Sequence, residues 1–301
     1  MDPKDAILRA REKKIVIPAF NVAHLPMMKP IVDAVVKENS VAMVQVARVE
    51  WEKMNAGTIE ETAKEYQMYG NSAHTMLHLD HIPAIDEDGI SVDYMPYFER
   101  AIAVGFQSVM IDGSRLDLEG NIRVTAEVTE MAHKAGVPCE AELGAVMGHE
   151  SGPLPPYEEI FASKMGFTSI DEAVRFVKET GVDWLSVAVG NIHGAIAEAS
   201  RSDKKPEARL DTEHVAALYD ATLTPLVLHG GSGINVECIR DAILAGIAKI
   251  NVGTEIRQSY DTAFESSQGN IEKAQEAVYD KVREIISDSL RITNSKDLLF
   301  G

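Results

Sequence analysis

Three histidines stand at places in the sequence where metal chemistry could occur. Their segments are HLDH (78–81), VGNIHG (189–194) and LHGGSG (228–233), and each follows an apolar, mostly β-branched run. Because such runs are typical of buried strands, we expect His81, His193 and His229 to arrive from three different strand ends. Three protein ligands, with a fourth position open to substrate, are typical of a catalytic zinc site. We therefore predict a divalent ion here, zinc fitting best, that acts as a Lewis acid.

A carboxylate lies directly beside the first of these histidines. Asp80 precedes His81 and shares a strand face with His78. Two interpretations of Asp80 are open from the residues alone. It could be an acceptor that orients the neighbouring imidazole, or an acid–base group that moves a substrate proton. His78 is expected to be structural and to support Asp80.

Eight short apolar runs are the candidate strands that must position these groups. They are 15–22, 41–47, 74–80, 108–114, 138–144, 184–190, 224–230 and 249–254. Helical patterns with apolar residues three and four positions apart lie between them, as in 27–39, 121–136 and 170–181. This alternation predicts one (β/α)8 TIM barrel over 1–301, an α/β fold with C-terminal helices after the last strand. An open doubly wound sheet is the alternative, but AFNVAHLP lacks the glycine-rich fingerprint expected after its first strand.

Distinctive polar residues gather at the carboxyl ends of the runs, which is the face where barrel enzymes place their active sites. They are Asn21, Asp80, His81, Asp112, Ser114, Glu142, His193, His229, Ser232, Asn251 and Thr254. One connection on this face, 145–170 after the fifth strand, is unusually long and contains several Gly, Ser and Pro residues. We expect it to be an active-site loop that closes over the site.

Composition limits the class of protein. The chain has 301 residues, 45% hydrophobic and 25% charged, as is ordinary for a globular domain. Its formal net charge of −18 argues against nucleic acid or an anionic membrane as a partner. No stretch approaches the length of a membrane span, the start MDPKDAILRAREKK is polar, and two cysteines suggest no disulfide framework. We therefore expect a cytoplasmic protein whose partner is a small molecule.

With these motifs in this order, the chain resembles the class II, zinc-dependent ketose-phosphate aldolases, which include the fructose- and tagatose-bisphosphate aldolases. The resemblance runs from about Ile15 to Thr254 and rests on HLDH, SVMIDGS with the later NI, EAELG, GNIHG, LHGGSG and KIN..T. It implies one zinc ion per subunit and a homo-oligomer, either a dimer or a tetramer. It also implies reversible cleavage of a ketose 1-phosphate or 1,6-bisphosphate, fructose 1,6-bisphosphate by default, into dihydroxyacetone phosphate and an aldehyde.

The resemblance also implies roles for individual acids. Asp80 would exchange a proton with the C4 hydroxyl of the sugar, and Glu150 in the long loop would move a proton at C3 of the triose. Glu142 would be an alternate ligand for a shifted zinc ion. Glu140, deeper on the same strand face, is expected to be structural. The assignment of Glu150 rests on its spacing from Glu142, because the local sequence MGHES differs from the usual family pattern.

A phosphate cradle is expected after the last two strands, where barrels often bind phosphate through backbone N–H groups and a helix N-terminus. Its expected members are Gly194, Gly230, Gly231, Ser232, Asn251, Gly253 and Thr254. The resemblance adds a monovalent cation, Na⁺ or K⁺, in the same cradle.

Some positions depart from the family pattern. Ala47 stands where many members carry serine, Gly253 where some carry aspartate, and Ile82 where glycine usually follows HLDH. No arginine aligns convincingly with a site for a second substrate phosphate, and the candidates are Arg48, Arg115, Arg257 and Arg291. The substrate on the aldehyde side therefore stays open.

Other functions remain as alternatives. One is a different zinc-dependent barrel enzyme, such as an isomerase or a hydrolase, and another is a non-catalytic sugar-phosphate binder. An aldolase that forms a Schiff base is disfavoured because Lys249 opens the last apolar run, at the end of the barrel opposite to the site.

Overall fold

Eight parallel strands close into a barrel in the order of the sequence, with β8 paired to β1. This is a computed structural model, and it describes residues 1–144, 156–191, 209–231 and 234–301. The strands are β1 (Ile17–Asn21), β2 (Ala42–Val46), β3 (Thr75–Pro83), β4 (Ser108–Asp112), β5 (Cys139–Leu143), β6 (Trp184–Val187), β7 (Leu226–Leu228) and β8 (Ile247–Val252). The predicted (β/α)8 barrel is confirmed, and the open sheet is excluded because β8 and β1 pair.

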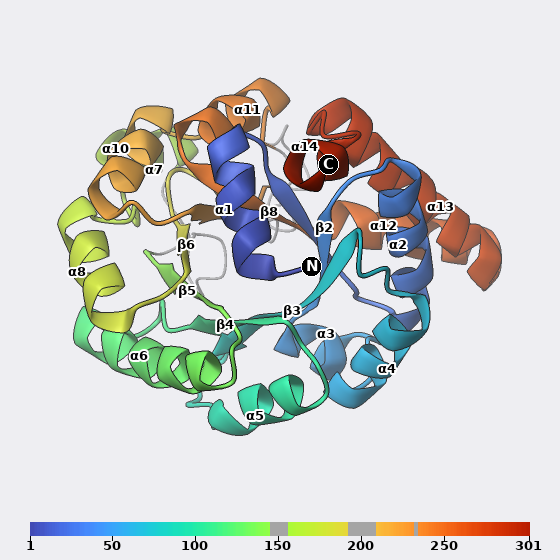
Figure 1. Ribbon diagram of the computed structural model, residues 1–301, viewed down its shortest axis with the longest axis horizontal. Helices are drawn as coiled ribbons and strands as arrows, with labels where there is room; N and C mark the ends of the chain where they lie inside the picture. Colours follow the sequence, from blue (N-terminus) through green and yellow to red (C-terminus); the bar gives the residue numbers. More distant parts are fainter. Residues whose placement is uncertain (145–155, 192–208, 232–233) are drawn as a thin grey trace.

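Helices surround these strands, as Figure 1 shows. In the described parts of the chain they are α1 (Pro3–Lys13), η1 (Leu25–Met27), α2 (Met28–Lys37), α3 (Arg48–Lys53), α4 (Ile59–Tyr69), α5 (Met95–Ala103), α6 (Leu118–Lys134), α7 (Tyr157–Ser163), α8 (Ile170–Thr180), α10 (Thr212–Thr222), α11 (Val236–Ala245), α12 (Thr254–Ser266), α13 (Ile271–Glu284), the π-helical turn η2 (Ile285–Ser289) and α14 (Ser295–Phe300). In the same parts of the chain, no helix is long and apolar enough to cross a bilayer.

Local sequence explains where several of these elements begin and end. The side chain of Ser169 caps α8, and Gly181 ends that helix in the left-handed conformation with φ of 69°. Asp117 caps α6, so this helix begins three residues before the predicted 121–136. Strand β8 begins at Ile247, two residues before the predicted 249–254. Part of the predicted loop 145–170 is helix α7, and residues 145–155 of it lie outside the described residues.

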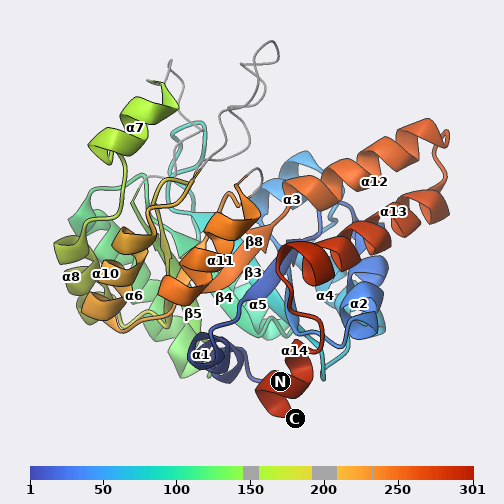
Figure 2. The ribbon, with the colours of Figure 1, turned by 90° about the horizontal axis from the view of Figure 1, so that it is seen from above.

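The inside of the barrel is divided into layers of different polarity. At the amino end, α1 packs against the strands (Figure 2). This apolar layer is made of Ala6, Ile7, Ala10, Ile17, Ala19, Val41, Met43, Met76, Trp184, Val227, Ala248 and Leu299. Above it lie buried polar side chains of Gln45, His78, Glu140 and Lys249. The amino end therefore supplies hydrophobic stabilisation beneath this polar middle layer.

Truncation of Ile7, a side chain of α1 that is buried in this layer, tests whether α1 stabilises the barrel by hydrophobic burial. Ile7→Ala should lower the free energy of unfolding by about 2–5 kcal/mol, because Ile7 is fully buried and the change leaves a cavity. Leu8→Ala is the matched control, since Leu8 is 48% exposed on the same helix, and it should change stability by about 0.5 kcal/mol or less. Urea denaturation followed by circular dichroism measures both. Equal losses would show that α1 does not contribute by burial inside the barrel.

Candidate active site

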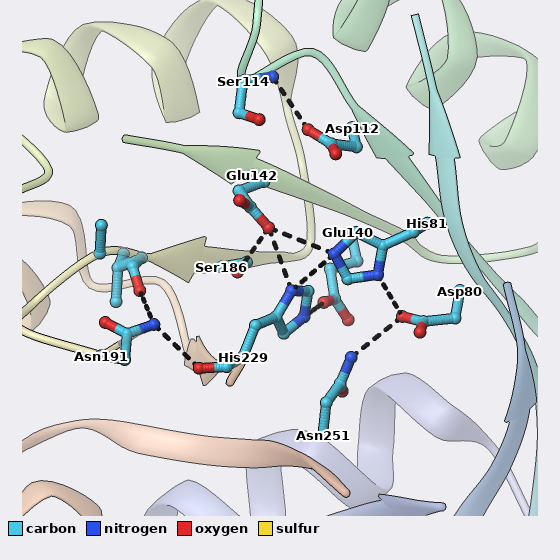
Figure 3. A network of polar contacts seen from close by, with 12 residues as sticks. Asp80, His81, Asp112, Ser114, Glu140, Glu142, Ser186, Asn191, His229 and Asn251 are labelled. Carbon is cyan, nitrogen blue, oxygen red and sulfur yellow. Dashed lines mark hydrogen bonds and ion pairs between the residues drawn. The ribbon is translucent and has the colours of Figure 1, made fainter. Parts of the chain in front are cut away.

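Three side chains that could together hold a metal ion converge at the carboxyl end of the barrel. His81 lies on β3, Glu142 on β5, and His229 directly after β7 (Figure 3). The Nδ1 atom of His229 is 3.0 Å from Nε2 of His81 and 3.0 Å from Oε2 of Glu142. The His81 Nε2 and Glu142 Oε2 atoms are 3.5 Å apart. Donor atoms around a tetrahedral zinc ion with bonds of about 2 Å lie roughly 3.3 Å apart, so this set fits such an ion.

The second nitrogen of each imidazole supports the same conclusion. Nδ1 of His81 is 3.1 Å from Oδ1 of Asp80, and Nε2 of His229 is 2.9 Å from Oε1 of Glu140. Since an ionised carboxylate can only accept, these ring nitrogens donate. Each imidazole is thereby oriented with its other nitrogen toward the shared point, as metal-bound histidines generally are. Binding of a metal there would release the proton that this nitrogen carries in the charged ring. His193, the third predicted ligand, lies outside the described residues.

Charges within this group shift its pKa values. Burial by itself would raise the pKa of Glu142, but hydrogen bonds from His229 and His81 hold it well below its usual range. Burial would lower the pKa of His81, yet Asp80 and Glu142 raise it well above its ordinary value. The pKa of His229 is also raised, because Glu140 and Glu142 outweigh its burial and the charge of His81. The carboxylates are therefore ionised at neutral pH, which is the state that attracts a cation.

Glu140 anchors His229 from below. Its Oε2 atom is 2.9 Å from Nζ of Lys249 and accepts a hydrogen bond of 2.5 Å from Nε1 of Trp184. All four side chains are at most 1% exposed. Burial would raise the pKa of Glu140, but Lys249 and His229 lower it to about 2. The structure thus contains a buried ion pair that holds His229, one of the three side chains that could hold a metal ion.

Lys249 does not lie where the sequence suggested. It is the third residue of β8 and pairs in register with Val227, in the middle of the barrel and not at its far end. Its ammonium group also donates to Oδ1 of Asn251 at 2.7 Å. Because this lysine is fully buried and paired with a carboxylate, its amine is not available to attack a carbonyl, so a Schiff base stays disfavoured for a different reason.

Asp80 is held by three neighbours and is 2% exposed. Besides His81, the side-chain nitrogen of Asn21 donates to its Oδ2 at 2.9 Å, and that of Asn251 donates to its Oδ1 at 3.0 Å. Burial would raise the pKa of Asp80, but the charge of and hydrogen bond from His81 hold it well below its usual range. Asp80 therefore orients His81, while an acid–base role is compatible with its ionised state.

His78 takes a different position from the one expected. Its Nδ1 lies 2.8 Å from the hydroxyl of Ser108, and its Nε2 faces Glu140 at 3.6 Å, so it does not support Asp80 directly. Burial and the charge of Lys249 lower its pKa to about 3. His78 is therefore a neutral group of the polar middle layer.

Two asparagines from the sequence motifs, Asn121 of NI and Asn191 of GNIHG, hydrogen bond to the backbone at the ends of other strands. Asn121 donates to the backbone oxygen of Glu142 at 2.9 Å, and Asn191 donates to that of His229 at 2.9 Å. A Cβ atom at Gly113 would come within 2.2 Å of Oδ1 of Asn121, so only glycine leaves room for this contact. These bonds position the backbone that carries two of the metal-binding side chains.

The predicted phosphate cradle is described in part. Gly230 and Gly231 directly follow His229, and Gly230 has the left-handed φ of 64° that favours glycine. Gly253 precedes Thr254, the first residue of α12, and provides no side-chain cap for that helix. The backbone N–H groups in the first turn of α12 are thus open to an anion. Gly194, Ser232 and the candidate base Glu150 lie outside the described residues.

Two candidate arginines for a second phosphate are engaged with acids. Arg48 is 2.9 Å from Glu52 and 3.6 Å from Asp86, and Arg257 is 3.2 Å from Asp261. Arg115 is exposed in the turn after β4, on the face of the site. Arg291 precedes Ile292, whose backbone oxygen accepts from Ser295. The Ser295 hydroxyl accepts from the backbone of Val41, the residue before β2, so this segment lies at the opposite end of the barrel.

Comparison with known proteins places the chain in a family. The family model described as fructose-bisphosphate aldolase class-II matches residues 1–297. The chain belongs to the class II fructose-bisphosphate aldolase family. It is accordingly an aldolase, as the resemblance implied, rather than an isomerase, a hydrolase or a non-catalytic binder.

Individual members of this family agree with the assignment. The Escherichia coli protein YdjI is 34% identical over 261 residues, which are 86% of this chain and 84% of YdjI. Its crystal structure, that of an aldolase, superposes with a TM-score of 0.74 over 97% of this chain and 98% of that one, at 28% identity. The fructose-bisphosphate aldolase of Streptococcus pyogenes serotype M1 is 32% identical over 274 residues, 90% of this chain and 84% of its own.

A third relative is named for a different substrate. The 6-phospho-5-dehydro-2-deoxy-D-gluconate aldolase of Halalkalibacterium halodurans is 40% identical over 184 residues, 61% of this chain and 55% of its own. Membership in the class II family therefore fixes the reaction type but leaves the sugar open.

Side chains missed by the sequence reasoning also line this site. Asn21 and Asn251 were recognised as polar strand ends, but their contacts with Asp80 were not foreseen. Ser186, opposite Glu142 in the β5–β6 pairing, lies 3.3 Å from its carboxylate. Glu50 is a buried acid on α3 that the sequence does not single out. Its only signal in the sequence was its place in a first helical turn, which usually indicates a solvent-exposed acid.

The Glu140–Lys249 pair leads to a prediction about the stability and metal retention of this class II aldolase. Glu140→Gln should cost roughly 3–5 kcal/mol of stability, because it leaves the Lys249 ammonium buried without a counter-charge. It should also weaken metal retention, since His229 loses its ionised acceptor. Unfolding by urea and metal analysis after dialysis measure the two effects.

The double variant Glu140→Gln/Lys249→Met is the control for charge burial. It removes both charges and should recover much of the lost stability. A double variant no more stable than Glu140→Gln alone would show that the ion pair is not the source of the loss.

Proposed function

We propose that this class II aldolase uses one zinc ion per subunit and cleaves a ketose 1-phosphate or 1,6-bisphosphate, with fructose 1,6-bisphosphate as the default substrate. The products are dihydroxyacetone phosphate and an aldehyde, and the same groups serve the reverse reaction. The observation that carries the proposal is the convergence of His81, Glu142 and His229 beside the ionised Asp80.

The residues that would hold zinc are His81, His229 and His193, with Glu142 as the ligand for an alternate position of the ion. When bound, a divalent ion would attract the ketose oxygens and stabilise the negative charge that develops during cleavage. The described donors support this proposal, because two imidazoles and a carboxylate face one point with their other nitrogens held by acids.

Asp80 is the proposed base for the C4 hydroxyl. It is ionised, nearly buried, and fixed by Asn21, Asn251 and His81, so its carboxylate is held in one place. Removal of the hydroxyl proton allows the C3–C4 bond to break and leaves the aldehyde on one side. Glu150 is the proposed acid that returns a proton to C3 of the triose half.

The phosphate of the triose half is assigned to Gly230, Gly231, Gly253 and Thr254, together with Gly194 and Ser232. Support comes from the open N-terminus of α12 and the glycine turn after β7, which offer backbone N–H groups. A sodium or potassium ion in this cradle, a dimeric or tetrameric assembly and a cytoplasmic location stay predictions.

The choice of sugar is a separate part of the proposal. The default follows the Streptococcus pyogenes relative, whose name specifies fructose bisphosphate. Tagatose 1,6-bisphosphate, which carries the same two phosphates, and a ketose with one phosphate are the alternatives. The pairing of Arg48 and Arg257 with acids favours only the ketose with one phosphate, because it leaves fewer arginines for a second phosphate.

A panel of ketose phosphates tests this function. Fructose 1,6-bisphosphate, tagatose 1,6-bisphosphate and fructose 1-phosphate are each incubated with the zinc-loaded enzyme. Release of dihydroxyacetone phosphate is followed with a coupled dehydrogenase. Fructose 1,6-bisphosphate should be cleaved fastest, and the activity should vanish after prolonged EDTA treatment and return with zinc. Full activity in a verified metal-free sample, or trapping of substrate on the protein by borohydride, would contradict the zinc mechanism.

Replacement of Asp80 separates its two roles. Asp80→Asn keeps an oxygen that can accept from His81 but removes the base, so zinc content should stay at the parent level. Cleavage should fall by roughly 10²–10⁴-fold, the usual contribution of proton transfer by a positioned group. Metal analysis and kcat for the best substrate of the panel measure both. If zinc is lost along with activity, Asp80 acts by orienting His81 and the assignment as base is wrong.

A further inference from the structure

One tyrosine hydroxyl joins three segments beside the carboxyl end of β6. The hydroxyl of Tyr157, the first residue of α7, accepts from the backbone N–H of Arg209 at 2.7 Å. The same oxygen lies 3.0 Å from the carbonyl oxygen of Gly190 and 2.9 Å from that of Arg209. Since a hydroxyl carries one hydrogen, this hydrogen is shared between the two carbonyls. Helix α7, the turn after β6 and the segment before α10 are thus held at one atom.

The hydroxyl belongs to a helix that packs directly on this turn. Figure 2 shows α7 at the end of the barrel opposite to α1. Tyr157 is 8% exposed and Ile160 is 5% exposed. A Cβ atom at Gly190 would come within 2.8 Å of the ring of Phe161, and the guanidinium carbon of Arg209 lies 4.5 Å from the centre of that ring. The hydrogen bonds of Tyr157 are therefore part of a packed contact.

The turn after β6 has a backbone that needs a restraint. Gly190 has a φ of 108°, in the region that favours glycine, and a glycine backbone is freer than that of any other residue. Tyr157 restrains it at the carbonyl oxygen. That oxygen shares one rigid peptide plane with the nitrogen and the Cα atom of Asn191. The hydroxyl therefore fixes the point from which the Asn191 side chain extends.

The side chain of Asn191 connects this turn to His229. Its Oδ1 accepts from the backbone N–H of Val189 at 2.8 Å, and its Nδ2 donates to the backbone oxygen of His229 at 2.9 Å (Figure 3). Asn191 is 4% exposed and His229 is 1% exposed, so both bonds are shielded from water. The His229 imidazole starts from this backbone and places its Nδ1 atom 3.0 Å from both His81 and Glu142.

We propose that Tyr157 is a positioning residue for the candidate metal ligands: its hydroxyl fixes the turn at 189–191, and Asn191 of that turn fixes the backbone of His229. The proposal rests on the proposed binding of zinc by His229. Tyr157 is not assigned any contact with the ion or with the substrate. It acts through two hydrogen bonds and one peptide plane.

A second tyrosine provides a matched control. The hydroxyl of Tyr66 on α4 donates to the backbone oxygen of Thr75 at 2.7 Å, and Thr75 is the first residue of β3. This bond also ties a helix to the backbone of the barrel. It lies at the start of the strand, however, whereas His81 lies near the end of the same strand.

Tyr157→Phe tests the link with the least disturbance, because it removes the hydroxyl and keeps the ring. Zinc affinity, measured by competition with a chelator, should fall roughly 10-fold, at the lower end of the 10- to 100-fold effects of residues that support metal ligands. Tyr66→Phe should bind zinc as tightly as the parent. Both variants should show the cooperative unfolding of the parent in urea.

A double variant tests the path through Asn191. Asn191→Ala should weaken zinc binding by itself, since the backbone oxygen of His229 loses its buried donor. Tyr157→Phe/Asn191→Ala should then bind zinc as tightly as Asn191→Ala alone, because the hydroxyl acts through the asparagine. Additive losses in the double variant would contradict this path.

Hydrogen exchange in the metal-free protein gives a readout that needs neither zinc nor substrate. The backbone N–H of Val189, which donates to Asn191, should exchange faster in Tyr157→Phe than in the parent. The N–H of Leu185 within β6, which donates to the backbone oxygen of Pro225, should exchange at the parent rate. Tyr66→Phe should leave both rates unchanged.

The outcomes are distinguishable from failure of the proposed function. A parent protein that binds no zinc would contradict that function, and the exchange of Val189 would still test whether Tyr157 fixes the turn. An unchanged exchange rate at Val189 in Tyr157→Phe contradicts the positioning role. So does zinc affinity at the parent level in Tyr157→Phe, or a loss of affinity that Tyr66→Phe shows to the same extent.

Discussion

A carboxylate buried in the middle of a barrel must be neutralised, and the active site depends on how Glu140 is neutralised. Leaving an ionised carboxylate unpaired in the interior would cost several kcal/mol. Here Lys249, Trp184 and His229 all direct N–H groups at its two oxygens. These partners come from β8, β6 and the end of β7, so the carboxylate on β5 joins the strands of one half of the barrel.

The same anchor reaches both chemical parts of the site. One oxygen of Glu140 holds His229, whose other nitrogen faces His81 and Glu142. The other oxygen holds Lys249, which donates to Asn251, and Asn251 donates to Asp80. The candidate metal ligands and the Asp80 carboxylate are therefore positioned against one buried group. A shift at Glu140 would displace both, and displacements of about 1 Å are enough to cost catalysis a factor of roughly 10².

Stability and chemistry are separated along the barrel axis. The apolar layer under α1 buries hydrophobic area at the amino end, and the indole N–H of Trp184 in this layer donates to Glu140 of the polar layer above. The polar middle layer is costly by comparison, because a buried ion pair is often no more stable than apolar residues of the same volume. The polar layer is therefore explained by the side chains that it orients, His229 and Asn251, and not by a contribution to stability. This agrees with the general rule that barrels place stability at the amino face and chemistry at the carboxyl face.

The sequence by itself determined the alternation of strands and helices, the barrel, and the carboxyl-end position of His81, Glu142 and His229. These follow from local patterns, because apolar periodicity and the residue that ends a run are written within a few positions. The depth of Lys249 and the burial of Glu50 beside the end of β2 were decided only by the tertiary structure. Both depend on the register between strands and on how a short helix turns back over β2, and pairings between such distant segments leave no local signal.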